Sequence, residues 1–431
     1  MQDILTETND APLPTPQVAG ADLQLGVSGV TYADLYRPER LRELAEIFYA
    51  EMEQADPAVH RQLIDYLAAS GATLAGTKAE SELLIAAAPH LSRFVARLFG
   101  VEGERAALIE VVRGQDAVFQ FKNFVARRAL KSFPAPQAIT INAAETNDRL
   151  ERLRRAAFRD TLADDRELGI ARMTMRLLDW EKHLRLSGAG AGATGDIAQV
   201  VGKAREEFIE AERALASQML SQSIEPNSRD DDQNISFVRS SLRLVEAWAA
   251  AHASQPDARV TVRGWVSFRF PHSLDYENLV QIERPCADVP ELMRGLDENL
   301  RRRDGFQLTD SRATGREVLD EVNYCLYCHE RDKDSCAKGL RDKDGAIKRN
   351  PLDILLEGCP LDEKISEMHL LQKRGDALAA LALVMIDNPL CPGTGHRICN
   401  DCMKACIFQK QEPVNIPQAE TGVLTDVLKM P

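Results

Sequence analysis

Three cysteine-containing stretches dominate this sequence: residues 325–336 (CLYCHERDKDSC), Cys359-Pro360, and residues 399–406 (CNDCMKAC). Together with Cys391 they contain eight of the nine cysteines, and the first 285 residues contain none. A Cys-x-x-Cys spacing allows one turn to direct two sulfur atoms at the same metal. Cysteines gathered this densely in one part of a chain predict a sulfur-ligated site there.

The spacing of the cysteines leaves two kinds of site open. Two Cys-x-x-Cys pairs would satisfy a zinc ribbon. Eight clustered cysteines are too many for one zinc ion, however, and Cys359 precedes a proline, as the closing cysteine of a bacterial ferredoxin motif does. Iron–sulfur clusters are therefore favoured. We interpret His329 and His396, which lie near the cysteines, as structural histidines, and the isolated Cys286 as a buried structural thiol.

The order of these motifs resembles a known family over residues 311–431. Asp387-Asn388-Pro389 lies between the cysteine groups, and Arg397-Ile398 precedes the second group. This arrangement is similar to the N-terminal iron–sulfur domain of FAD-dependent pyridine-nucleotide oxidoreductases, as in dihydropyrimidine dehydrogenase and the small subunit of glutamate synthase. The resemblance implies two [4Fe–4S] clusters with interleaved ligands. The first set implied is Cys325, Cys328, Cys336 and Cys406; the second is Cys359, Cys399, Cys402 and Glu420, with Cys391 as an alternative to Glu420.

The resemblance also implies a function. The region would relay electrons between a flavin and the redox centre of a partner, as the iron–sulfur part of an oxidoreductase, with no catalytic residue of its own. FAD and NAD(P)H would bind to a flavoprotein domain or subunit outside this sequence. The alternative from a different class is a zinc-stabilised helical scaffold that binds other proteins.

The net charge and the apolar runs of the sequence limit which kinds of partner and which cellular compartment we expect. The net charge of −13 argues against a general nucleic-acid binder. The longest apolar run, residues 377–386, is too short to span a bilayer, and we interpret it as a core helix. No signal-peptide pattern opens the sequence, so we expect a cytoplasmic protein with reduced thiols. Self-association into a homo-oligomer is left open.

Helical periodicity prevails along the chain, so we predict a mainly α fold. The exception is residues 259–283, where alternating polar and apolar residues predict a small β hairpin or sheet. A Gly-rich segment at 188–195 spells G-x-G-x-x-G but follows a charged helical stretch, so we interpret it as a loop. The regions expected are a flexible arm (1–30), a helical domain (31–133), a long-helix region (134–256), a small α+β segment (257–310) and a C-terminal helical ferredoxin-like domain with the two clusters (311–431).

Overall fold

The computed structural model describes residues 23–71, 74, 76–187, 195–216, 230–280, 282–295, 305–306 and 312–431. Helices make up most of these residues, which confirms the mainly α prediction. Most of the arm expected over residues 1–30, and residues 188–194 of the Gly-rich segment, lie outside the described residues. Among the described helices, none combines the length and the apolar character needed to cross a bilayer.

The chain divides into two compact units that are not consecutive in sequence. Unit 1 contains Met1–Glu110, Leu274–Thr314 and Tyr324–Pro431, and unit 2 contains Val111–Ser273 and Gly315–Asn323. All the cysteines belong to unit 1.

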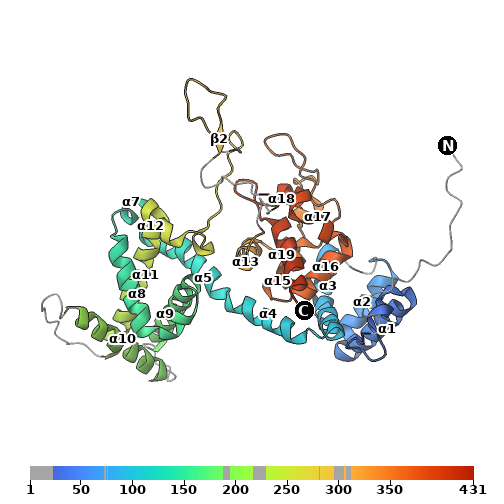
Figure 1. The fold of residues 1–431 in the computed structure, drawn as a ribbon, viewed down its shortest axis with the longest axis horizontal. Coiled ribbons are helices and arrows are strands. Elements are labelled where there is room, and N and C mark those ends of the chain that lie inside the picture. The colour runs from blue at the N-terminus through green and yellow to red at the C-terminus, as the bar shows by residue number, and fades with distance from the viewer. Residues whose placement is uncertain are drawn as a thin grey trace. The chain divides into compact units, whose positions relative to one another are not determined.

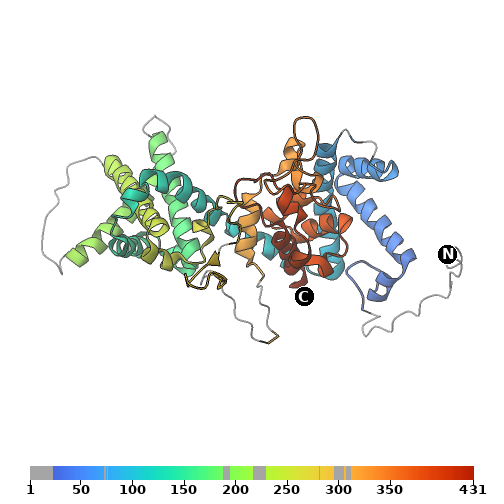
Figure 2. The same ribbon diagram turned by 90° about the horizontal axis from the view of Figure 1, so that it is seen from above.

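Unit 1 is built around the apolar helix α16 (Ala377–Asp387), which packs against α3 (Thr77–Phe99), α15 (Ile365–Lys373) and α19 (Ile416–Leu428) (Figures 1 and 2). Its residues 377–380, 383 and 384 are buried, as expected for a core helix. The carboxylate of Asp376 caps its N-terminus and also forms a 2.5 Å ion pair with Arg105 of α4. Both interactions fix the start of α16. The cap provides an acceptor for the amide of Ala379, and the ion pair neutralises the guanidinium of Arg105. The helices that contribute to unit 1 are α1 (Pro38–Ala55), α2 (Pro57–Ala68), α3 (Thr77–Phe99), the first part of α4 (Glu102–Gly114), α14 (Ser335–Lys338), α15 (Ile365–Lys373), α17 (Cys391–Ile398), α18 (Asp401–Ala405) and α19 (Ile416–Leu428).

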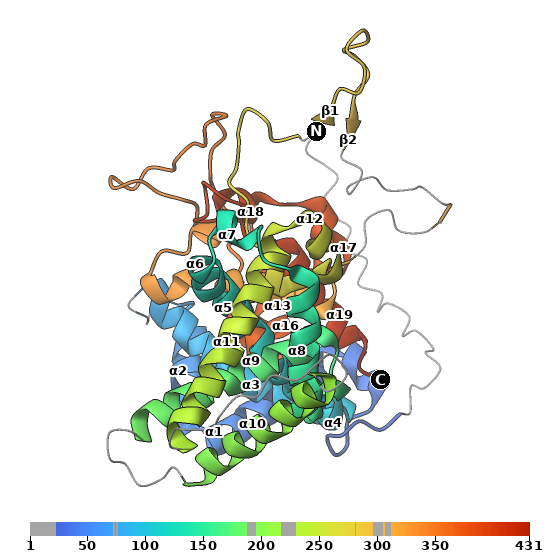
Figure 3. The same cartoon turned by 90° about the vertical axis from the view of Figure 1, so that its left-hand side faces the viewer.

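Unit 2 is a bundle in which α11 (Asp230–Ser254) lies along α8 (Ala143–Ala157) and α9 (Arg166–Ser187) (Figure 3). Its centre contains Trp248, which is fully buried. In the same unit Arg128 pairs with the buried carboxylates of Glu181 and Glu246, at 3.2 and 2.7 Å. The other helices of this unit are α5 (Asp116–Phe124), α6 (Leu130–Ser132), α7 (Ala135–Ala138), α10 (Gly195–Ala216), α12 (Pro256–Arg259) and α13 (Gly315–Tyr324), whose last residue belongs to unit 1.

The strand predicted at the start of residues 259–283 is wrong. After α12, the chain forms two 3-10 turns, Val260–Val262 and Val266–Phe268. Residues 266, 267 and 268 are all buried, because this stretch packs Phe268 edge-on against Trp248, at 5.8 Å between ring centroids. A strand would place alternate residues on opposite faces. A two-stranded antiparallel sheet does form, but from β1 (Ile282–Glu283) and β2 (Arg294–Gly295).

Candidate functional site

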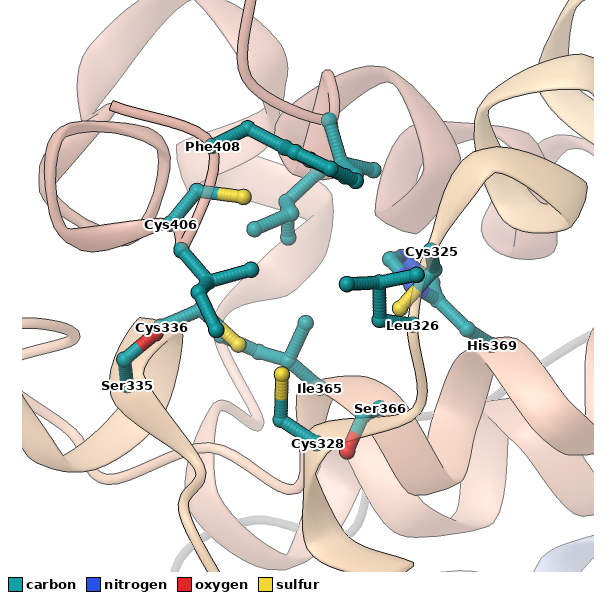
Figure 4. Close-up of a pocket in the computed structure, with 13 residues that line it drawn as sticks. Cys325, Leu326, Cys328, Ser335, Cys336, Ile365, Ser366, His369, Cys406 and Phe408 are labelled. Atoms are coloured by element: carbon teal, nitrogen blue, oxygen red, sulfur yellow. The ribbon is translucent and has the colours of Figure 1, made fainter. Parts of the chain in front are cut away.

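Four cysteines from three segments of unit 1 line one pocket: Cys325, Cys328, Cys336 and Cys406. Cys325 follows α13, Cys328 opens a 3-10 turn, Cys336 lies on the short helix α14, and Cys406 follows α18. Figure 4 shows their sulfur atoms directed into a common space. These are the four residues expected to form the first ligand set.

The backbone around Cys325 and Cys328 turns sharply through two left-handed residues. Tyr327 (φ 49°) and Asp332 (φ 53°) flank the 3-10 turn Cys328–Arg331. Residues other than glycine adopt this conformation at a cost, and such residues concentrate at functional sites. The main-chain N–H of Tyr327 donates to Cys325 Sγ at 3.4 Å. The turn therefore both bends the chain and supplies a donor to one of the sulfur atoms.

The thiols of this pocket are shielded from water. Burial raises the pKa of Cys325 to about 12 and that of Cys328 to about 11, and nearby negative groups add to both shifts. Burial also raises the pKa of Cys336 well above its ordinary value, and its Sγ donates to Asp334 Oδ1 at 3.1 Å. At neutral pH these sulfur atoms hold their protons unless a bound cation replaces them. Metal binding at such a site would release protons.

The rest of the pocket wall is largely apolar. Ile365, Val414 and Ile416 line it together with Phe408, whose ring stacks on Tyr324 at 4.3 Å between centroids. Two polar side chains also line it without a hydrogen-bond partner, His369 and Ser335. Buried polar groups nearly always have partners, so these two indicate a pocket shaped for a polar occupant.

The 22 residues between Cys336 and Cys359 form a loop whose two ends lie side by side. The amide of Cys359 donates to the carbonyl of Cys336 at 2.8 Å, and that of Leu340 donates to Leu356 O at 2.9 Å. Gly339 and Gly358 permit this close approach: a Cβ on Gly358 would lie 2.6 Å from the nitrogen of Gly339. The loop therefore brings Cys359 next to Cys336, which lines the first pocket.

Three cysteines of the second expected set come together: Cys359, Cys399 and Cys402. Each interacts electrostatically with another of the three, and Cys402 also interacts with Glu363. Burial raises the pKa of Glu363 to about 7, and the carboxylate of Glu420 adds to the shift. Cys399 is exposed and Cys402 is buried, so this group is more open to solvent than the first.

Glu420 and Cys391 are paired with each other instead. The Cys391 thiol donates a hydrogen bond to the Glu420 carboxylate, and Asn388 Nδ2 donates to Glu420 Oε1 at 3.1 Å. Through Asn388 this pair is connected to Glu363, which also hydrogen-bonds to that amide. In the structure, Glu363 therefore interacts with the cysteines directly, whereas Glu420 is connected to Glu363 through the side chain of Asn388.

Outside these groups, His329 is buried and its Nδ1 lies 2.7 Å from Ser366 Oγ, as expected of a structural histidine. The side chain of His396 lies outside the described residues. Cys286 is half-buried, so the expectation of a buried thiol there is wrong.

Sequence reasoning missed His369 and Glu363. His369 lies within an apolar helical stretch and has no cysteine beside it. Glu363 does lie four residues after Cys359, and that proximity was the only available signal.

In the part of the chain that the structure describes, no three His, Cys, Asp or Glu side chains form a group that could hold a metal ion as they stand. The four thiols of the first pocket surround a space instead. Their donor type, their burial and the two unpartnered polar side chains fit a metal-containing group that fills the pocket. They are the residues that could hold one.

Comparison with known proteins identifies relatives but no activity. A family model described as the RP005 N-terminal alpha-helical domain matches residues 25–100, which include α1, α2 and α3. Two proteins of Rickettsia prowazekii (strain Madrid E) are similar to this chain. The uncharacterized protein RP005 is 24% identical over 340 residues, which cover 77% of this chain and 93% of RP005. The uncharacterized protein RP006 is 68% identical over 38 residues, which cover 9% of this chain and only 5% of RP006. No solved structure matches.

These findings overturn the family resemblance of residues 311–431. The family that matches is a helical domain near the other end of the chain, and neither relative is described as an iron–sulfur protein or an oxidoreductase. The identification with the iron–sulfur domain of dihydropyrimidine dehydrogenase and the glutamate synthase small subunit is therefore wrong. Conserved order among a few cysteines was too weak a basis for it, because unrelated proteins place thiols at such spacings independently.

Proposed function

We propose that this chain is an iron–sulfur protein that carries electrons, with one [4Fe–4S] cluster bound by Cys325, Cys328, Cys336 and Cys406. The proposal rests on the chemistry of the thiols and on no family. The observation that carries it is that four cysteines, separated by up to 80 residues, turn their sulfur atoms into one buried pocket (Figure 4).

The form of the pocket favours a cluster over a single ion. In a [4Fe–4S] cluster each cysteine binds a different iron atom, so the sulfur atoms surround the group and do not converge on one point. Four thiols that line a pocket match that requirement. A structural zinc ion requires its four ligands to close around one centre.

When bound, the cluster supplies a site that accepts and gives up single electrons. The residues of this chain hold it and set its surroundings. Apolar residues such as Ile365 and Val414 exclude water, and the Tyr327 amide donates to the sulfur of Cys325. Both features tune the potential at which an iron–sulfur site is reduced.

We further propose a second [4Fe–4S] cluster at Cys359, Cys399 and Cys402, with a carboxylate as the fourth ligand. Glu420 was the residue expected from the sequence, and Glu363 is the carboxylate that interacts with Cys359 and Cys402. The 2.8 Å hydrogen bond between Cys359 and Cys336 would place the two clusters close enough to exchange electrons.

An electron carrier needs a donor and an acceptor. A flavoprotein that uses FAD and NAD(P)H remains our prediction for one of them, as does the assignment to an oxidoreductase. The acidic charge of −13 supports a protein partner over nucleic acid.

Metal analysis of the anaerobically purified full chain tests the proposal. We expect a brown protein with iron and acid-labile sulfide in equal amounts. Cys325→Ser and Cys359→Ser should each remove about half of the iron, one cluster of two. Cys286→Ser, a half-buried cysteine of the same unit, is the matched control and should keep it all. A colourless protein with stoichiometric zinc would refute the proposal and favour the helical scaffold. Unchanged iron in both ligand variants would refute the ligand assignment.

A further inference from the structure

His369 is an unusual residue in the four-cysteine pocket. It lies on α15, its side chain is fully buried, and neither ring nitrogen has a hydrogen-bond partner. It also lines the same pocket as the four thiols (Figure 4). A buried polar group without a partner is costly, so its retention indicates a partner that completes the site.

The other buried histidine near the cysteines behaves differently. His329 places its Nδ1 2.7 Å from Ser366 Oγ, and the main-chain amide of His329 lies 3.3 Å from the same oxygen. Its hydrogen-bonding needs are met within the protein. The unpartnered state of His369 is therefore a property of its position in the pocket and not of buried histidines in general.

The protonation state of His369 limits what it can do. Burial lowers the pKa of its imidazole to about 4, so the ring is neutral at physiological pH and carries one N–H. A neutral imidazole N–H donates one hydrogen bond. The apolar residues of the pocket offer no acceptor. The hydroxyl groups of Ser335 and Ser366 also line the pocket, but neither is hydrogen-bonded to the ring of His369. The sulfur atoms of the cysteines and of a bound cluster are the remaining acceptors.

We propose that the ring N–H of His369 donates a hydrogen bond to a sulfur atom of the cluster held by Cys325, Cys328, Cys336 and Cys406, and thereby raises its reduction potential. This inference rests on the proposed function. Reduction adds negative charge to the cluster, so a donor aimed at one of its sulfur atoms stabilises the reduced form more than the oxidised form. His369 would be a tuning residue and not an iron ligand.

The test compares the full-length protein with three variants after anaerobic purification. His369→Phe removes the donor but retains a planar ring, and His369→Gln retains a neutral N–H donor. Met368→Leu is the matched control, because Met368 is equally buried on the same helix and packs into a different cluster of the core. The measurements are iron and sulfide per chain and the midpoint potential, followed by electron paramagnetic resonance.

We expect all variants to retain the iron and sulfide of the wild type. His369→Phe should lower the one-electron reduction equilibrium constant of one cluster at least tenfold, which is about 59 mV. His369→Gln should recover most of that loss, and Met368→Leu should show none. A Phe variant with full cluster content and an unchanged potential would overturn the inference.

A measurement on the wild type covers the case in which His369→Phe loses its cluster. In protein labelled with nitrogen-15 histidine, a donor N–H should give a weak nitrogen coupling to the reduced cluster. A strong coupling would indicate direct ligation, and no coupling would indicate no contact; either would overturn the inference. Absence of iron and sulfide from the wild type would instead refute the proposed function, so the two failures are distinguishable.

Discussion

Gly358 holds together the two segments that carry Cys336 and Cys359, and Gly358→Ala should separate them. The residue has a φ of +89°, and an added Cβ would lie 2.6 Å from the nitrogen of Gly339 and 2.7 Å from the carbonyl oxygen of Ala337. Both contacts are with main-chain atoms, which cannot turn away as a flexible side chain would. The backbone has to move, or the 2.8 Å hydrogen bond between Cys359 and Cys336 has to lengthen.

Two costs add up in this variant. An L-residue in the left-handed region costs about 1–2 kcal/mol. Overpacking against fixed atoms costs about a further 1–3 kcal/mol, so we expect a total of about 2–5 kcal/mol. Gly345→Ala provides the matched control, because Gly345 has almost the same φ, +85°, but nothing lies within 4 Å of an added Cβ. That variant should show the backbone cost alone, about 1–2 kcal/mol.

Equilibrium urea unfolding followed by circular dichroism measures both values. Gly345 and Gly358 belong to unit 1, so both substitutions act on the same transition even if unit 2 unfolds separately. The difference between the two variants then isolates the close approach of the chains. Equal destabilisation by the two substitutions would refute the reasoning, because it would show that the segments do not pack against each other as described.

Two further predictions concern the cores of the two units. Asp376→Ala should destabilise unit 1 by about 3–5 kcal/mol, because it leaves the guanidinium of Arg105, whose side chain is 17% exposed, without its carboxylate partner. Glu51→Ala, which breaks the half-exposed pair with Arg97, should cost only about 0–1 kcal/mol, and similar losses in the two variants on urea unfolding would contradict the argument. In unit 2, burial lowers the pKa of His252 below its ordinary value of 6.5, and Arg166 lowers it further. As the pH falls below about 6.5 the unfolded chain takes up this proton before the folded chain does, so the free energy of unfolding should decrease. The melting temperature of the wild type should therefore drop more between pH 7.5 and pH 5.5 than that of His252→Gln, and equal drops would show that His252 makes no contribution.

The helices of this protein could be predicted from sequence because their signals are local. The run that forms α16 is apolar and follows Asp376, whose side chain accepts a hydrogen bond from the amide of Ala379. Capping and periodicity act within a few residues of chain, so they are visible without a structure.

The stretch at 259–268 shows where local signals fail. Its alternating residues are typical of a strand, but Val266 and Phe268 are both buried, and the ring of Phe268 packs against Trp248 of α11. Burial against a ready-made helical surface stabilises the 3-10 turns more than β propensity favours a strand without a partner.

Some residues of the candidate site could be predicted from the sequence, and others could not. Cysteine density and spacing predicted which residues would gather, and the structure does bring Cys325, Cys328, Cys336 and Cys406 to one pocket. Spacing did not predict Glu363, which interacts with Cys402 through space. Spacing also did not predict His369, because that residue is distinguished only by the lack of a hydrogen-bond partner for its buried ring nitrogens.

From its amino acids alone, this chain is identifiable as helical and as rich in cysteine over residues 325–406, because helix signals lie among neighbouring residues and the cysteines are visible in the sequence itself. Only the tertiary structure decides which thiols share a pocket, which carboxylate accompanies the second group, and which buried histidine is left without a partner. Those facts depend on segments far apart in sequence that meet only in the folded chain, so no pattern of neighbouring residues reveals them.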